Sequence, residues 1–120
     1  MKLEVKNLKK KFKDFDAVKN INFSINAGQT LGVLGPNGCG KTTTIGMLLG
    51  LIKPSSGEIL IDDENFEKLN REKILSSFNF ASPYVELPKK LTVKENLEIY
   101  GRLYGVENLN QRIEEISHDL

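Results

Sequence analysis

The sequence predicts an α/β fold in which a short apolar strand leads through a glycine-rich loop into a helix. Three observations carry this prediction. The segment Thr30–Leu34 is apolar, and Gly35–Thr42 follows it with the sequence Gly-Pro-Asn-Gly-Cys-Gly-Lys-Thr. Segments that alternate between apolar and polar residues precede this loop, and segments with helical periodicity follow it. A glycine-rich loop between a strand and a helix is suited to holding the phosphates of a nucleotide.

The composition is that of an ordinary globular protein with room for one domain in its 120 residues. Lys and Arg number 17 against 16 Asp and Glu, so net charge gives no case for a nucleic-acid partner. No apolar run reaches the roughly 18 residues of a membrane span, and the N-terminus lacks the apolar core of a signal peptide. Cys39 stands alone, which fits a reducing compartment. We therefore expect a cytoplasmic protein that reaches a membrane only through partners.

Two strands are expected before the loop. Leu3–Leu8 places apolar residues on one side and charged residues on the other, as a half-buried strand does. Ile21–Ile25 alternates in the same way and closes at an Ala27–Gly28 turn. The basic run Lys9–Lys13 is interpreted as a solvated strand edge or turn, in preference to a phosphate-attracting group. These strands predict a small antiparallel β-layer attached to a parallel core.

After the loop, helix and strand signals follow one another. The expected elements are a helix at Thr43–Leu49, a strand at Glu58–Ile61, a turn at Asp62–Asn65, a short helix at Asn70–Ser76 and a strand at Phe78–Ala81. The phosphate loop sets the start of the first helix, which explains why a helix is expected despite three threonines and a glycine.

Two helices are expected near the end of the chain. Thr92 and Glu95 have the spacing of a capping box, and Gly105 marks the end of the helix that they begin. A second helix starts near Asn108. Its apolar stripe comprises Leu109, Ile113, Ile116 and Leu120.

The loop residues indicate specific phosphate chemistry. Glycines allow the backbone to curl so that its N–H groups point inward and form a nest for an anion. Lys41 is placed to reach the β- and γ-phosphates, and the Thr42 hydroxyl is placed to bind Mg²⁺.

Three segments, in this order and at these spacings, resemble the ATP-binding cassette ATPases of ABC transporters. They are GQTLGVLGPNGCGKTT at 28–43, GLIKPSSGEI at 50–59 and LTVKENL at 91–97. The resemblance implies an incomplete P-loop NTPase fold of the ABC type, with the small β-layer and the start of a helical subdomain. Residues 1–90 would form the N-terminal half of the ATP-binding core. Residues 91–120 would form the first helices of the helical subdomain, and the rest of the domain is absent from this chain.

The resemblance also implies which residues bind nucleotide. They are Phe12, Val18, Gly35, Pro36, Asn37, Gly38, Cys39, Gly40, Lys41, Thr42 and Thr43, with Thr42 as the metal ligand. Phe12 matches the place of an aromatic residue that stacks on adenine, and its alternative is a plain core position. Val18 matches an apolar residue near the nucleotide, with strand packing as its alternative. Cys39 occupies a slot usually filled by a small residue, which we interpret as tolerated packing, with sensitivity to oxidation as the weaker alternative.

One departure from the family concerns a glutamine that helps to coordinate Mg²⁺ and the attacking water. Its expected place is Ser82–Pro83, and the only glutamines here are Gln29 and Gln111. The other role of this loop, docking on a membrane partner, does not require glutamine and is assigned to Pro83–Pro88.

The family's catalytic groups have no match in this chain. They are an Asp-Glu strand end, a downstream histidine and a Leu-Ser-Gly-Gly-Gln-like motif from a second copy. His118, Glu114 and Glu115 are interpreted as a solvated helix face. The sequence therefore predicts no catalytic residue in this chain and no ATP turnover by it alone.

The favoured function is a part of a transport ATPase that binds ATP and Mg²⁺, works as a dimer of cassettes and sits on the inner face of a membrane through a transmembrane subunit or domain. Export is weakly favoured over import. Two alternatives remain open: a stand-alone nucleotide-binding module without turnover, and another P-loop enzyme such as a kinase or GTPase.

Overall fold

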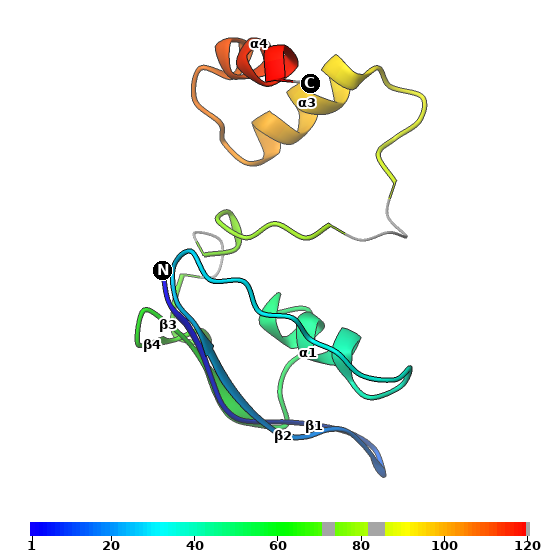
Figure 1. Ribbon diagram of the computed structural model, residues 1–120, viewed down its shortest axis with the longest axis vertical. Helices are drawn as coiled ribbons and strands as arrows, with labels where there is room; N and C mark the ends of the chain where they lie inside the picture. Colours follow the sequence, from blue (N-terminus) through cyan, green and yellow to red (C-terminus); the bar gives the residue numbers. More distant parts are fainter. Residues whose placement is uncertain (71–73, 82–85, 120) are drawn as a thin grey trace. The chain divides into compact units, whose positions relative to one another are not determined.

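The computed structural model describes residues 1–70, 74–81 and 86–119, and it contains two compact units, Met1–Phe78 and Asn79–Leu120. The first unit is an antiparallel sheet with helix α1 packed against it, and the second holds helices α3 and α4 (Figure 1). Each unit is described by itself below.

Four strands form the sheet of the first unit, in the order β2-β1-β3-β4. The strands β1 (Leu3–Phe12) and β2 (Phe15–Ile25) form a hairpin, and β1 also pairs with β3 (Ser56–Ile61). The short strand β4 (Glu64–Asn65) completes the edge. The predicted antiparallel layer is therefore confirmed, and its first hairpin is longer than expected because β2 begins six residues before Ile21.

A bulge in β1 interrupts the pairing on both sides of that strand. Asn7 adopts a φ of 49°, and its N–H donates to Asn22 Oδ1 at 2.7 Å instead of continuing the ladder. The register of β1 shifts between Val5 and Leu8 against β2. The extra residue lets Val5 and Leu8, three positions apart, both lie in the core at 1% and 0% exposure.

The core of the first unit lies between the sheet and α1 (Lys41–Leu48). Its buried residues are Val5, Leu8, Val18, Met47, Ile59, Ile61 and Phe66. Met47 brings α1 into this cluster, and that contact fixes the helix whose first turn carries the glycine-rich loop.

The turn after β3 is tighter than the expected Asp62–Asn65 turn. Only Asp62 and Asp63 form it. Both have positive φ, as a type I′ hairpin turn requires, so Glu64 and Asn65 belong to β4.

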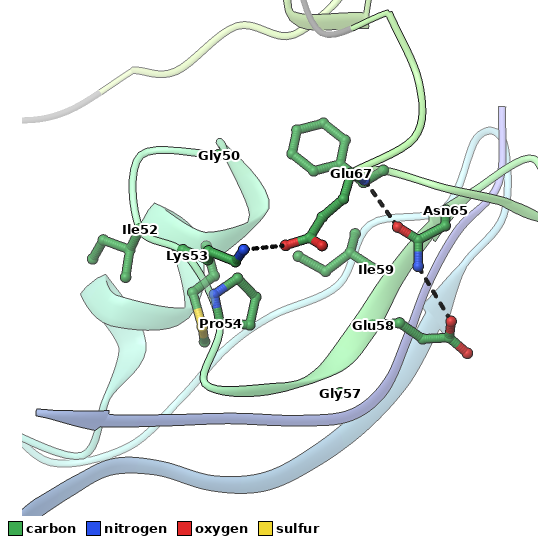
Figure 2. Close-up of a pocket in the computed structure, with 11 residues that line it drawn as sticks. Gly50, Ile52, Lys53, Pro54, Gly57, Glu58, Ile59, Asn65 and Glu67 are labelled. Carbon is green, nitrogen blue, oxygen red and sulfur yellow. Dashed lines mark hydrogen bonds and ion pairs between the residues drawn. The ribbon is translucent and has the colours of Figure 1, made fainter.

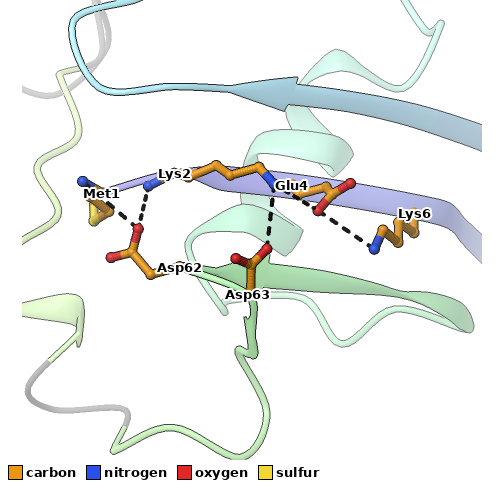
Figure 3. A network of polar contacts seen from close by, with 6 residues as sticks. All are labelled: Met1, Lys2, Glu4, Lys6, Asp62 and Asp63. Atoms are coloured by element: carbon orange, nitrogen blue, oxygen red, sulfur yellow. Dashed lines mark hydrogen bonds and ion pairs between the residues drawn. The ribbon is translucent and has the colours of Figure 1, made fainter.

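Lys2 connects the start of β1 to this turn through a hydrogen bond and an ion pair (Figure 3). Its backbone N–H donates to Asp62 Oδ1 at 2.6 Å, and its ammonium lies 3.4 Å from Asp63 Oδ1. The hydrogen bond to Asp63, followed by one to Glu4, raises the pKa of Lys2. These groups are exposed, so they stabilise little.

The second unit is a helical hairpin. Helix α3 (Val93–Leu103) begins at Thr92, whose hydroxyl accepts from the Glu95 N–H at 3.2 Å, while the Thr92 N–H donates to Glu95 Oε2 at 2.7 Å. The predicted capping box is thus confirmed. Gly105, with a φ of 65°, follows the end of α3, and α4 (Leu109–Asp119) comes next. Both predicted helices are present.

The capping box makes helix α3 sensitive to acid. Hydrogen bonds from the Thr92 backbone N–H and then from its hydroxyl lower the pKa of Glu95 below its ordinary value of 4.5. The stabilising contribution is therefore present above the unfolded value and is lost as the pH falls through the lowered folded value. An NMR titration should give a Glu95 midpoint below 4.5, and Thr92→Ala should move it partway back, because the backbone bond remains. A midpoint unaffected by folding would contradict this.

Two predicted strands are wrong. Thr30–Leu34 and Phe78–Ala81 are irregular, and none of the four strands of the sheet pairs with them. Leu34 is 95% exposed. A strand depends on a neighbour for its backbone hydrogen bonds, and apolar sequence alone does not supply one. Of the expected helix at Asn70–Ser76, Ile74 and Leu75 are helical and Ser76 lies in a turn; residues 71–73 lie outside the described residues.

Among the described residues, none of the helices has the length and apolar character needed to span a bilayer.

Candidate functional site

The loop Gly35–Thr42 turns back on itself before α1. Gly38 and Gly40 have φ values of 82° and 93°, in the left-handed region that glycine tolerates best. The Cys39 N–H donates to Pro36 O at 3.3 Å, which closes the turn. Residues 35–39 are exposed, so a ligand can reach this turn from solvent.

Lys41 reaches back across the loop. Its ammonium donates to Gly35 O at 2.7 Å and to Pro36 O at 2.9 Å, and lies 3.8 Å from Cys39 Sγ. These contacts hold the positive charge over the loop, where it stays accessible to solvent. A phosphate bound in the loop would offer charged oxygens in place of the two carbonyl oxygens, and charge-assisted hydrogen bonds are roughly twice as strong as neutral ones.

The N-terminus of α1 supplies further donors. Gly40 is the N-cap residue, makes no side-chain capping bond and accepts the first helical hydrogen bond from Thr44 N–H at 2.8 Å. The N–H groups of Lys41, Thr42 and Thr43 precede that first bond, so they are available to an anion. The Thr42 side chain is exposed and Thr43 is half-buried. The helix dipole adds partial positive charge at the same point.

Contact with β2 fixes the loop on the sheet. A Cβ at Gly40 would overlap the Ala17 carbonyl oxygen and would lie 3.1 Å from Val18 Cγ2. Only glycine therefore lets the loop approach β2 this closely. Val18 is buried at 5% exposure, so strand packing accounts for its position, and it also lies beside the loop.

Phe12 is exposed at the tip of the β1–β2 hairpin and does not belong to the core, with 46% of its surface accessible. Lys10 Nζ lies 4.9 Å from the centroid of its ring, and the same ammonium donates to Lys53 O at 2.8 Å. The interpretation of the basic run Lys9–Lys13 as a solvated strand edge or turn does not include this contact between Lys10 and the Phe12 ring. The signal was available: residues two apart on a strand point to the same side.

Cys39 and Asn37 are exposed in the loop. The Cys39 sulfur lies against Gly35, where a Cβ would come within 2.6 Å of it. The predictions for Ser82–Pro83 and for the start of Pro83–Pro88 concern residues 82–85, which lie outside the described part of the chain. His118 is exposed on α4, as expected of a solvated face.

A separate cavity of about 360 Å³ lies between the end of α1 and the β3–β4 hairpin (Figure 2). Met47, Ile59 and Phe66 line its apolar part, while Lys53 and Glu67 form an exposed ion pair of 3.8 Å at its rim. None of its lining residues belongs to the glycine-rich loop. The cavity is therefore not part of the candidate site, which consists of the loop, the start of α1 and the neighbouring hairpin.

This arrangement is suited to binding a polyphosphate through backbone N–H groups and one lysine, and the hairpin that contacts the loop at Gly40 also carries the exposed Phe12 ring. The family model described as "ABC transporter" matches residues 18–120. A solved structure titled "Structure of ATP binding subunit of ABC transporter" superposes with a TM-score of 0.77 at 28% identity, covering 90% of this chain and 45% of that one. This bears out the α/β cassette fold predicted from the sequence.

Two curated relatives are likewise described as ATP-binding proteins of transport systems. The bacitracin transport ATP-binding protein BcrA of Bacillus licheniformis is 41% identical over 111 residues, 90% of this chain and 35% of its own length. The osmoprotectant import ATP-binding protein OsmV of Salmonella typhimurium is 34% identical over 121 residues, 95% of this chain and 32% of its own length. The chain therefore spans 35% and 32% of the length of these two relatives.

Proposed function

The chain belongs to the ABC transporter family, and from that premise we propose that it forms the nucleotide-binding part of a subunit that uses ATP to drive transport across a membrane. Residues 1–90 are assigned to the ATP-binding core and residues 91–120 to the first helices of a helical subdomain. The observation that supports this most is the loop Gly35–Thr42, where the Lys41 ammonium lies over the loop carbonyls and α1 begins without a side-chain cap.

The residues present fit MgATP. A Cβ at Gly40 would push the loop off β2, so the position of the loop on the sheet depends on glycine there. In the proposal, the Lys41 ammonium and the N–H groups of the loop and of the first turn of α1 hold the phosphates, and the Thr42 hydroxyl ligates Mg²⁺. These N–H groups are those of Gly38, Gly40, Lys41, Thr42 and Thr43. Bound Mg²⁺ would neutralise phosphate charge. Other proposed nucleotide contacts come from Gly35, Pro36, Asn37, Cys39, Thr43, Phe12 and Val18.

ATP hydrolysis is proposed for the whole subunit and not for this chain by itself. Phosphoryl transfer to water requires a residue that positions the water and acidic ligands for the metal, in addition to a phosphate cradle. We assign no residue of this chain to those roles. The complete subunit is proposed to act as a dimer with a second cassette, on the cytoplasmic side of a membrane through a transmembrane partner. Its relatives differ in transported substrate, so no substrate is assigned.

Calorimetry with MgATP and a phosphate-release assay test this proposal on the purified chain. We expect saturable binding of MgATP at one site and no sustained phosphate release. Steady hydrolysis that disappears in Lys41→Ala would contradict the division between binding and catalysis. Absence of any MgATP binding by a folded chain would contradict the proposed site itself.

A further inference from the structure

We propose that Lys10 is a positioning residue that holds the Phe12 ring in place for stacking on the base of the bound nucleotide. The inference rests on the proposed function, and it concerns a lysine that lies outside the phosphate loop.

The first step is the contact between the two side chains. Lys10 Nζ lies 4.9 Å from the centroid of the Phe12 ring, within the range in which a cation is attracted to the negative face of an aromatic ring. The ring keeps 46% of its surface exposed. An ammonium covers one face of a ring only, and a planar base needs the other face.

The second step is that the ammonium itself is held. Lys10 Nζ donates to Lys53 O at 2.8 Å, in the turn that follows α1. The Lys11 N–H donates to Ser55 Oγ at 3.0 Å in the same region. The tip of the hairpin is thus attached to the α1–β3 connection, and the lysine that lies over the ring has a fixed direction.

The third step relates the ring to the phosphate loop. Lys10 pairs with Val18 across the hairpin, and Val18 lies beside Gly40 of the loop. The β1–β2 hairpin that carries Phe12 is therefore also in contact with the phosphate loop. A ring that is already ordered loses less side-chain entropy when a base stacks on it, so the bound state is favoured.

Lys10 could instead act through its charge alone, by attracting the phosphates over a distance. The two roles differ in their dependence on the base. A positioning role affects ligands that carry a base and leaves inorganic tripolyphosphate unaffected, whereas long-range attraction affects both.

The experiment measures the affinities of MgATP and of magnesium tripolyphosphate for the full chain by calorimetry. We expect Lys10→Met to weaken MgATP binding about two- to fivefold, the size of an exposed cation–π contact, and to leave tripolyphosphate binding unchanged. Lys10→Arg keeps a cation over the ring and should preserve MgATP affinity. Lys11→Met, which removes the same charge from the next residue, should show no preference between the two ligands.

A double-mutant cycle completes the test. In the Phe12→Leu background, Lys10→Met should cause no further loss of MgATP affinity, because the ring through which it acts is gone. Equal weakening of both ligands by Lys10→Met, or an undiminished effect in Phe12→Leu, would overturn the inference while leaving the proposed function standing. Failure of the wild-type chain to bind either ligand would overturn the proposed function and this inference with it.

Discussion

Lys41→Ala is expected to reduce the affinity of the chain for MgATP by about 10- to 100-fold, the effect of losing a hydrogen bond to a charged group. The structure gives the reason. The Lys41 ammonium already lies over the loop, 2.7 Å from Gly35 O and 2.9 Å from Pro36 O, so little rearrangement is needed for it to meet a phosphate. Alanine removes both the cation and the two contacts that keep the loop closed.

Isothermal titration calorimetry measures this loss directly, and Lys53→Ala is the matched control. Lys53 is also a lysine near α1, but its side chain is 81% exposed and faces Glu67. We expect that control to bind MgATP within about twofold of wild type, since exposed ion pairs contribute little. If both variants lost affinity equally, the effect would reflect net charge, and the assignment of Lys41 to the phosphates would be wrong.

The elements that the sequence predicts well are those specified by neighbouring residues. Thr92 and Glu95 sit three residues apart and cap α3 through their own hydrogen bonds, so no distant contact is needed. The alternation of Leu3–Leu8 and Ile21–Ile25 likewise reports burial on one face of a sheet. The glycine-rich loop is also specified by neighbouring residues, because its turn depends on the positive φ values of Gly38 and Gly40 within it.

The elements that the sequence predicts badly depend on partners far along the chain. Thr30–Leu34 has strand-like residues and yet forms no strand, because no strand of the sheet pairs with it. The bulge at Asn7 has no local signature either, since it is closed by Asn22 on β2. The contact of Lys10 with Phe12 is not evident from the basic composition of Lys9–Lys13, because it depends on which side of the strand each lysine occupies.

Gly57→Ala is expected to destabilise the first unit by about 2–5 kcal/mol, which combines the cost of a left-handed alanine with that of overpacking. Gly57 has a φ of 84° and lies under the bulge of β1. A Cβ there would overlap the Asn7 carbonyl oxygen and would come within 2.6 Å of Lys6 O. Because both atoms belong to the backbone of β1, an inner strand of the sheet, neither can turn aside as a flexible side chain could.

Gly28→Ala separates the cost of a left-handed alanine from the cost of overpacking. Gly28 has a similar φ of 78°, but a Cβ added there would meet nothing within 4 Å. It should therefore cost only the conformational part, about 1–2 kcal/mol. Urea unfolding of the two variants gives the comparison, and the excess for Gly57 measures how rigidly β3 is held against the bulge. Equal losses would mean that β1 yields to the added methyl group. In that case the bulge would not be a fixed feature, and the burial of both Val5 and Leu8 would need a different explanation.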